Sequence, residues 1–368
     1  KNKNHPAYLQ ASVPDSATYR KVRAVLIRWY RRNARSLPWR ETKDPYAIWV
    51  SEIMLQQTQV KTVIPYYKRF MKEFPEPQTL AEASEDQVLS AWSGLGYYRR
   101  ARLLHAGVRE VVARYGAKLP EDPLLRRSLP GIGAYTAGAI GSIAFNRPEP
   151  IVDGNVARVF ARLFGIYTPL GRSDTEKRLW AYAEGLVKGS HPGDFNQALM
   201  ELGATVCTKR PECERCPVKE FCYAYRIGHT EKLPVPRVRK APIAVDWVAV
   251  VPFATESKGK PVRFWLVKGE QRLFGGLWSL PVVEGKGLAC VTKALTDAGI
   301  VGRVTKEPAT SMVHVLSHRK LRVELWLAQK SQATSSANRR VVSLEEALQL
   351  GISTLTRKLL QAQKQLRL

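Results

Sequence analysis

Cysteines and carboxylates are the side chains of this sequence best suited to do chemistry. Four of the five cysteines lie within sixteen residues in the pattern C-x5-C-x2-C-x5-C, at Cys207, Cys213, Cys216 and Cys222. In a reducing compartment such clustering favours a metal site over disulfides. Zinc ribbons usually show two C-x2-C pairs and this chain has one, while four thiolates suit a [4Fe–4S] cluster equally well. The spacing therefore predicts a metal site with four cysteine ligands and leaves the metal open.

Glu52 lies in a strongly apolar stretch of sequence. On a helix its neighbours at i−4, i−3 and i+3 are Ile48, Trp49 and Leu55. A carboxylate among such side chains is partly desolvated, which raises its pKa and keeps it protonated near neutral pH, as a general acid requires. The alternative is a structural glutamate that is paired with an arginine such as Arg40.

Asp153 is the second candidate carboxylate, directly before a helix predicted over 156–163. Aspartate is a good N-cap and Asp-Gly favours a turn, so the residue alone is better explained as a cap. A capping carboxylate can still serve chemistry if it faces a developing cation.

Gly131 and Gly133 precede a helix predicted in the 131–146 region. Backbone N–H groups at such a turn can hold a phosphate against the helix N-terminus. An ordinary link between two helices is the alternative. With Leu129-Pro130 before the glycines and Thr136-Ala137 after them, the segment is similar to the helix-hairpin-helix signature of DNA repair glycosylases.

The net charge points to a polyanionic partner. The chain has 58 Lys and Arg against 32 Asp and Glu, a net charge of +26, shared as +13 up to Gly228 and +13 beyond it. Nucleic acid is the partner we expect, with generic solubilising charge as the alternative. No apolar run approaches the roughly 18–20 residues of a membrane helix, and the first twenty residues hold no apolar signal core. We expect a monomeric cytoplasmic protein without a membrane partner, associated with the nucleoid if bacterial.

The elements that position these residues fall into two parts. We predict a flexible segment over 1–17, a helical domain over 18–228 with helices at 19–33 and 45–56, and a proline-rich basic linker over 229–242. Residues 243–368 alternate in a β-strand pattern, with strands predicted at 243–253, 262–267, 311–316 and 321–328. An all-α domain followed by an α/β domain is expected.

From about residue 20 to 222 the chain resembles the endonuclease III superfamily, and within it the MutY branch. The resemblance rests on five motifs in order: Leu-Pro-Trp-Arg40, Ser-Glu-Ile-Met-Leu-Gln-Gln-Thr58, Gly-Leu-Gly-Tyr-Tyr98, Val-Asp-Gly-Asn155 and Glu-Leu-Gly-Ala204. It implies a helix-hairpin-helix glycosylase fold with an iron–sulfur cluster, rather than zinc, on the four cysteines. The family's first cysteine gap is usually one residue longer, which puts the loop conformation in doubt more than the ligand set.

The resemblance also implies roles for individual residues. Glu52 would protonate N7 of an adenine flipped out of the DNA stack, and Asp153 would stabilise or capture the oxocarbenium sugar. Tyr135 and Asn155 would orient these carboxylates. Tyr135 occupies the position where bifunctional relatives carry the lysine that attacks the sugar, so a monofunctional enzyme is expected.

Further residues would contact adenine or the opposite base. Arg40, Leu55 and Gln197 would line the adenine pocket, and Gly131 and Gly133 would bind the DNA backbone. The residues that resemble contacts to the 8-oxoguanine side are Gln57, Thr58, Leu95 and Tyr97, with Tyr97 as an intercalating wedge. Packing at a helix end is the alternative for Tyr97 and Tyr98.

The C-terminal part resembles a Nudix fold without its hydrolase residues. Gly-Leu-Trp-Ser-Leu-Pro281 is similar to the start of that fold, but 290–299 lacks the paired glutamates that hold Mg²⁺, so a Nudix-like binding domain is expected. Ser317 and His318 occupy the position of the Phe-Ser-His loop by which MutY proteins bind 8-oxoguanine, with Leu316 replacing the phenylalanine. Alone, a histidine in a β-turn would be inert.

These observations predict a monofunctional glycosylase that removes adenine opposite 8-oxoguanine or guanine in double-stranded DNA during base excision repair. A pyrimidine or mismatched-thymine glycosylase is disfavoured by Glu52 and by the domain with Ser317 and His318. A catalytically silent DNA-binding module would be expected to lack Glu52 or Asp153. A Nudix hydrolase is disfavoured by the missing metal carboxylates.

Overall fold

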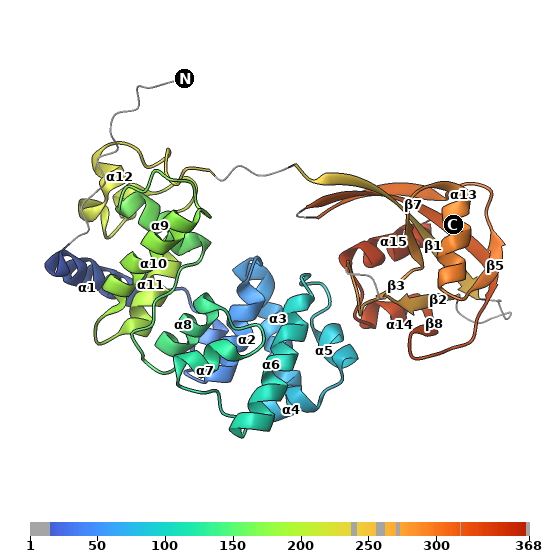
Figure 1. The fold of residues 1–368 in the computed structure, drawn as a ribbon, viewed down its shortest axis with the longest axis horizontal. Coiled ribbons are helices and arrows are strands. Elements are labelled where there is room, and N and C mark those ends of the chain that lie inside the picture. Colours follow the sequence, from blue (N-terminus) through green and yellow to red (C-terminus); the bar gives the residue numbers. More distant parts are fainter. Residues whose placement is uncertain (1–14, 237–240, 255–261, 270–272, 317, 366–368) are drawn as a thin grey trace. The chain divides into compact units, whose positions relative to one another are not determined.

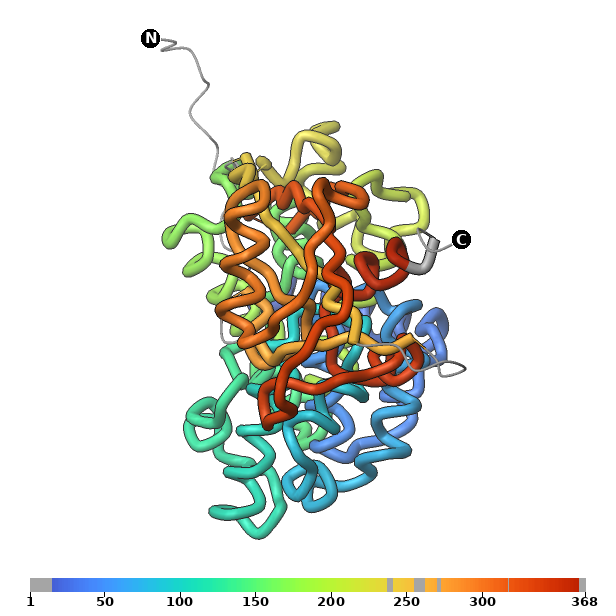
Figure 2. Tube along the Cα trace, turned by 90° about the vertical axis from the view of Figure 1, so that its right-hand side faces the viewer, coloured from blue at the N-terminus to red at the C-terminus, as the bar shows by residue number. Residues whose placement is uncertain are grey.

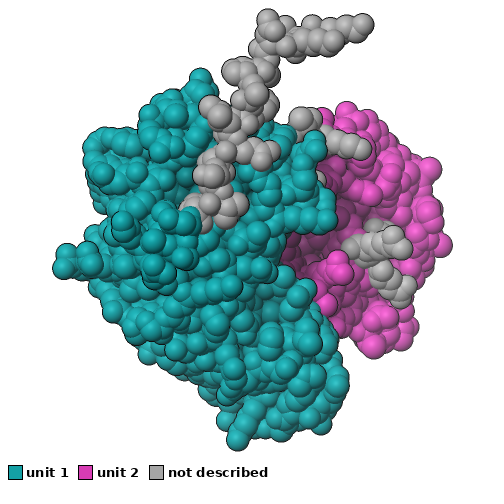
Figure 3. All heavy atoms as spheres, turned by 60° about the vertical axis from the view of Figure 1, so that its left-hand side comes forward, with its two compact units in different colours: residues 1–81, 106–238 teal, residues 82–105, 239–368 magenta. Residues whose placement is uncertain are grey.

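The computed structural model of the chain describes residues 15–236, 241–254, 262–269, 273–316 and 318–365. The described residues form two compact units, shown in two colours in Figure 3: those within 1–81 and 106–238 form unit 1, and those within 82–105 and 239–368 form unit 2. Parts of the predicted flexible segment 1–17 and linker 229–242 lie outside the described residues, and the predicted domain boundaries stay predictions. Within the described ranges, no helix has the length and hydrophobicity needed to span a membrane.

Unit 1 is helical (Figure 1), and the helices predicted at 19–33 and 45–56 are confirmed as α1 and α2. Helices α4 and α6 cross the boundaries between the two units. The helices are α1 (Ser16–Asn33), η1 (Pro38–Arg40), α2 (Pro45–Leu55), α3 (Val60–Glu73), α4 (Pro77–Glu82), α6 (Arg99–Tyr115), α7 (Pro123–Ser128), α8 (Ala134–Ile143), α9 (Gly154–Leu163), α10 (Ser173–Val187), α11 (Pro192–Thr205), η2 (Cys213–Arg215), η3 (Lys219–Phe221) and α12 (Tyr223–Arg226).

Helix α2 is the buried centre of unit 1. It begins where the Asp44 side chain accepts hydrogen bonds from the backbone N–H groups of Tyr46 and Ala47, at 3.1 and 3.3 Å, with Pro45 at the first helical position. Every residue from Tyr46 to Met54 is buried, so this helix has no solvent-exposed polar face. Its one acidic side chain, Glu52, is therefore carried into the protein interior.

Helix α8 packs against α2 and α11, and α11 packs against α9, with small residues at close approaches of these helices. A Cβ atom added at Gly138 of α8 would lie 2.0 Å from the carbonyl oxygen of Pro150. A Cβ atom added at Gly203 of α11 would lie 2.7 Å from Cβ of Asn155. These approaches bring the N-terminus of α9 against α11, where Asp153 caps α9.

Unit 2 combines helices with a mixed sheet. The central strands β1 and β7 run parallel, from Ile243 beside Arg319 to Pro252 beside Ala328, and lie side by side in Figures 1 and 2. The strand order is β3-β2-β1-β7-β5, while β4 pairs with β1, β6 with β7 and β8 with β2. The elements are α5 (Glu85–Ala91), β1 (Ile243–Ala254), β2 (Arg263–Lys268), β3 (Trp278–Ser279), β4 (Val282–Glu284), α13 (Gly287–Asp297), β5 (Val301–Val304), β6 (Thr310–Val315), β7 (Arg319–Gln332), β8 (Arg339–Ser343), α14 (Leu344–Gln349) and α15 (Thr354–Gln365).

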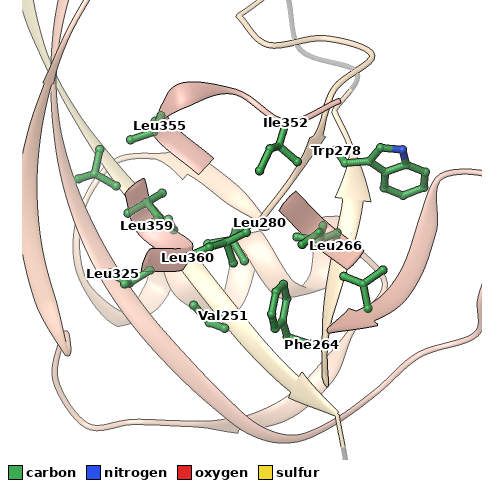
Figure 4. Packing of buried hydrophobic residues seen from close by; sticks show 14 of the residues in the cluster. Val251, Phe264, Leu266, Trp278, Leu280, Leu325, Ile352, Leu355, Leu359 and Leu360 are labelled. Carbon is green, nitrogen blue, oxygen red and sulfur yellow. The ribbon is translucent and has the colours of Figure 1, made fainter. Parts of the chain in front are cut away.

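The side chains of β1 point alternately into two hydrophobic cores, as the period of two in a strand requires. Ala249 and Val251 pack in the core that contains Leu355 and Leu359 of α15 (Figure 4). Val248 and Val250 pack instead in the core that contains Val291 and Leu295 of α13. The four predicted strands are confirmed within two or three residues, except for the end of β7, and so is the predicted order of a helical domain followed by an α/β domain.

Candidate active site

A pocket of about 610 Å³ in unit 1 contains most of the residues predicted to act on adenine. Helices α2 and α8, the N-terminus of α9, α11 and the η1 turn supply its walls. It brings together the four predicted catalytic residues and all three predicted adenine contacts, along with two predicted contacts to the opposite base and one hairpin glycine: Glu52, Tyr135, Asp153, Asn155, Arg40, Leu55, Gln197, Gln57, Thr58 and Gly133.

Glu52 is buried in this pocket, with 4% of its surface exposed. The hydroxyl of Tyr135 donates a hydrogen bond of 2.7 Å to Glu52 Oε2, and the same hydroxyl lies 3.1 Å from Sδ of Met200. Burial raises the pKa of Glu52 to about 7, and the negative charge of Asp153 adds to this rise. The hydrogen bond from Tyr135 and the positive charge of Arg40 oppose the rise. A carboxyl group with this pKa can donate a proton near neutral pH.

Arg40 is not the ion-pair partner of Glu52. Its Nη2 atom lies 2.8 Å from Oε2 of Glu201, which belongs to α11. Within the described residues Glu52 forms no ion pair at all. The alternative of a structural glutamate paired with Arg40 is therefore wrong.

Asp153 both caps α9 and faces the pocket. Its Oδ1 accepts a hydrogen bond of 2.7 Å from the backbone N–H of Val156, and its Oδ2 accepts one of 3.2 Å from Nδ2 of Asn155. Burial raises the pKa of Asp153, while these hydrogen bonds oppose the rise because they favour the ionised form. The predicted cap is confirmed, and the same carboxylate is available to chemistry in the pocket.

The two carboxyl groups thus occupy one pocket with different partners. Glu52 receives a single hydroxyl donor in an apolar setting, whereas Asp153 receives two N–H donors at a helix N-terminus. Such a difference separates a proton donor from a carboxylate that stabilises positive charge, which is the division of labour in glycosidic bond cleavage.

The sequence prediction missed Arg35, Met200 and Glu201, which also line the pocket. A signal for Glu201 was present, because it lies four residues after Gln197 and so on the same face of a helix. Met200 lies three residues after Gln197 and had the same signal, whereas nothing in the sequence marks Arg35, which follows the end of α1.

Leu95 and Tyr97 belong to unit 2 and do not line this pocket. Leu95 is buried, whereas Tyr97 is 47% exposed and has a left-handed backbone with φ of 49°. The guanidinium of Arg100 lies 5.4 Å from the Tyr97 ring. Tyr98 is buried and its hydroxyl donates to the carbonyl of Ile352 at 2.6 Å, so helix-end packing describes Tyr98 and not Tyr97.

The hairpin glycines lie at the start of α8. Gly131 has φ of 79°, which favours glycine, and Gly133 is the N-cap of the helix. A Cβ atom added at Gly133 would meet nothing within 4 Å, so the backbone at Gly133 borders open space. Gln57, at the end of α2, also has a left-handed backbone with φ of 55°.

A second hollow, of about 840 Å³, lies within unit 2. Tyr97 lines it together with Leu316 and His318, while Ser317 between them is outside the described residues. Its described lining includes the basic side chains Arg99, Arg102, His314, His318 and Arg319.

The four clustered cysteines line one small cavity of about 20 Å³, next to Arg162 of α9. All four thiols are free of disulfides, and Nη1 of Arg162 donates to Sγ of Cys207 at 3.3 Å. Burial raises the pKa of the Cys216 thiol to about 12. No group of three or more His, Cys, Asp or Glu side chains in the described ranges could hold a single metal ion.

Arg158, also on α9, connects the cysteine loop to the pocket. Its Nη2 donates to Oδ1 of Asn155 at 2.8 Å, and its Nε donates to the carbonyl of Cys207 at 2.8 Å. Asn155, which donates a hydrogen bond to Asp153, and Cys207, the first of the four cysteines, therefore both accept hydrogen bonds from the Arg158 guanidinium.

Comparison with known proteins agrees with this geometry. A family model for HhH-GPD superfamily base excision DNA repair proteins matches residues 50–184, and one for the NUDIX domain matches residues 260–362. An adenine DNA glycosylase of Mus musculus is 34% identical over 96% of this chain and 79% of its own length. One of Buchnera aphidicola (from Acyrthosiphon pisum) is 36% identical over 80% and 82%. A thermostable thymine-DNA glycosylase structure is 31% identical with a TM-score of 0.52, over 58% of this chain and 99% of that one. The chain belongs to the adenine DNA glycosylase family.

Proposed function

We propose that this enzyme is a monofunctional glycosylase that removes adenine paired with 8-oxoguanine, and also adenine paired with guanine, from double-stranded DNA. The observation that carries the proposal is the pair of carboxyl groups, Glu52 and Asp153, held in one pocket with opposed hydrogen-bonding environments. The net charge of +26 supports a DNA partner.

In the proposed reaction a flipped adenine enters the pocket of unit 1. Glu52 donates its proton to N7, which draws electrons from the glycosidic bond and lets the base leave. The sugar becomes an oxocarbenium ion, and the carboxylate of Asp153, held by Asn155 and the α9 N-terminus, stabilises that charge until water adds. Gln197 and Arg40 line the same pocket and supply polar groups for the base edge.

Monofunctional chemistry is supported by the side chains around the pocket. Strand cleavage by bifunctional glycosylases requires an amine that attacks the sugar and forms a Schiff base. Of the described residues that line the pocket, none is a lysine, and Tyr135 donates its hydroxyl hydrogen to Glu52. A phenol cannot form the Schiff base, so the product would be an abasic site in an intact strand.

Recognition of 8-oxoguanine is proposed for Ser317 and His318 with Tyr97, Leu95, Gln57 and Thr58. The unit 2 hollow supports this proposal because Tyr97 and His318 line it together. Its arginines would favour a phosphate-rich partner, which positions DNA without reading its sequence. Leu316 keeps an apolar side chain where the family pattern has an aromatic ring.

We further propose that Cys207, Cys213, Cys216 and Cys222 hold a [4Fe–4S] cluster. Four thiols around one cavity suit this group, since each iron of a cluster takes one thiolate and its ligands lie further apart than those of a single ion. When bound, the cluster would tie the 207–222 loop together and could exchange electrons. Lys209, Arg210 and Arg215 on that loop would face the DNA backbone.

The test uses the purified chain with duplexes carrying A:8-oxoguanine, A:G, T:G or thymine glycol, each analysed with and without alkali. We expect cleavage at adenine opposite 8-oxoguanine and guanine, and only after alkali. Glu52→Gln is the matched control and should release no base while still binding the duplex. Cleavage of only the pyrimidine substrates, or nicking without alkali, would contradict the proposal.

A further inference from the structure

Arg35, Arg40 and Glu201 form a cluster at one wall of the adenine pocket. The Glu201 side chain is fully buried and uses both carboxylate oxygens. Oε1 accepts from Nε of Arg35 at 2.7 Å and from its backbone N–H at 3.2 Å. Oε2 accepts from Nη2 of Arg35 at 2.9 Å and from Nη2 of Arg40 at 2.8 Å. Four hydrogen bonds thus converge on one carboxylate.

These contacts fix the direction of Arg40. Its Nη1 donates to the carbonyl of Arg35 at 2.9 Å, and its guanidinium carbon lies 5.3 Å from the centre of the Tyr30 ring. The Arg40 side chain is only 14% exposed. Arg40 therefore has few alternative positions and stays in the pocket that contains Glu52.

Three groups from three elements act on the ionisation of Glu52. Tyr135 comes from α8, Asp153 from the N-terminus of α9, and Arg40 from η1. Arg35 and Glu201 also line the pocket, where Glu201 pairs with both Arg35 and Arg40. Because charges interact more strongly inside a protein than in water, an uncompensated Arg40 would favour the ionised form of Glu52 and so impair an acid.

We propose that Glu201 is a positioning residue for adenine excision, which holds Arg40 at the pocket together with Arg35 and offsets its positive charge beside Glu52. The proposal rests on the proposed function, in which Glu52 is the acid. The cluster contains two cations and one anion, so its net charge is +1 with Glu201 and +2 without it. Burial alone would raise the pKa of Glu201, but hydrogen bonds from Arg35 and Arg40 outweigh it and lower that pKa, so the carboxylate stays ionised.

A second ion pair on α11 provides a matched control. Asp194 lies seven residues before Glu201, about two helical turns, and pairs with Arg31 of α1 at 2.7 Å. These two side chains are 26% and 53% exposed, and neither lines the pocket. Asp194→Asn removes an ion pair between α11 and α1 without changing the charge at the pocket.

The experiment measures single-turnover adenine release from an A:8-oxoguanine duplex and from an A:G duplex between pH 5 and 9. In wild type the rate should fall as Glu52 ionises, near its pKa of about 7. Glu201→Gln should move this fall to lower pH, by on the order of one pH unit, because it leaves two adjacent cations. Arg35→Gln should move it to higher pH, and by less, because this side chain is 39% exposed and its charge is screened.

The double variant Arg35→Gln/Glu201→Gln restores a net charge of +1 and should return the fall in rate close to its wild-type pH. Asp194→Asn should leave the profile unchanged. Circular dichroism and thermal melting check that each variant is folded. Should Glu201→Gln fail to fold, the double variant is compared with Arg35→Gln, because the two differ only at position 201 and the fall in rate should lie at lower pH in the double variant.

Two results would overturn the proposal while leaving the proposed function intact. One is a rate lowered equally at every pH in Glu201→Gln, with no shift, which would mean a purely structural role. The other is a shift of the same sign in both single variants. By contrast, a wild-type rate without any fall near pH 7, or turnover by Glu52→Gln, would refute Glu52 as the acid and this inference with it.

Discussion

Replacing Glu52 by glutamine should inactivate the enzyme and stabilise it at the same time. The protein holds this carboxyl group in an apolar site, and burial raises its pKa from an ordinary 4.5 to about 7. In the unfolded chain the same group ionises near its ordinary pKa and is solvated by water. Between these two values the unfolded state is ionised and the folded state is protonated, so folding must take up a proton.

The sign and size of the effect follow from this proton uptake. Below about pH 4.5 Glu52 is protonated in both the folded and the unfolded state. As pH rises from about 4.5 to 7, the group ionises in the unfolded state but not in the folded state, so the free energy of unfolding of the wild type falls. At about 1.4 kcal/mol per pKa unit, the loss approaches about 3 kcal/mol and then levels off. Glutamine does not ionise, so Glu52→Gln does not undergo this loss of stability. Loss of a general acid should lower the rate by a factor of about 10² to 10⁴.

Urea unfolding of wild type and Glu52→Gln at pH 4, 5, 6, 7 and 8, followed by tryptophan fluorescence, measures the difference. We expect nearly equal stabilities at pH 4 and an advantage for Glu52→Gln that grows to pH 7 and stays constant at pH 8. A constant difference across this range would refute a raised pKa for Glu52. Base release on the A:G duplex, measured in parallel, must be lost in the same variant.

Four further predictions follow from single contacts. Tyr135→Phe removes a hydrogen bond that favours ionised Glu52, so the fall in rate with pH should move upward by about one pH unit in a rate-against-pH profile. Arg126→Met should lower the free energy of unfolding by about 3–5 kcal/mol in urea, because it leaves Glu149 without the buried guanidinium that donates to it. Cys216→Ser should lower the iron content per chain in a colorimetric assay. His318→Ala should lower the ratio of rates on A:8-oxoguanine and A:G duplexes by about tenfold, at a cost of about 1.4 kcal/mol, and an unchanged ratio would contradict its role.

Local signals in the sequence were sufficient for most elements of the fold. Asp44-Pro45 marks the start of α2, and the alternation of apolar residues after Ile243 marks β1. Neither signal depends on distant parts of the chain. The grouping of residues 82–105 with the C-terminal residues in unit 2 has no such local signal. It arises from contacts between segments that are far apart in the sequence, such as that of Tyr98 with Ile352.

The site was predictable where a motif fixes both the residue and its helix. Glu52 and Tyr135 follow a recognisable cap or glycine turn, Asp153 is itself a cap, and the three meet in one pocket. The charge partner of Arg40 was not predictable in the same way, because both Glu52 and Glu201 were available to it. Only the packing of α11 against η1 decides between them, and it leaves Glu52 without a cation of its own.

The pairing of Arg40 with Glu201, and not with Glu52, explains how the buried helix α2 can carry a protonated carboxyl group. If Arg40 paired with Glu52, the ion pair would lower the pKa of the carboxyl group and the proton would be absent at neutral pH. If Arg40 were missing, the pocket would lose one of its two proposed polar groups for the base edge and keep only Gln197. In the proposed reaction the ion pair of Arg40 with the fully buried Glu201 meets both requirements, because it holds the guanidinium in the pocket and lets Glu52 keep its proton. On this proposal the chemistry of Glu52 depends on Glu201, a residue that need not contact the substrate.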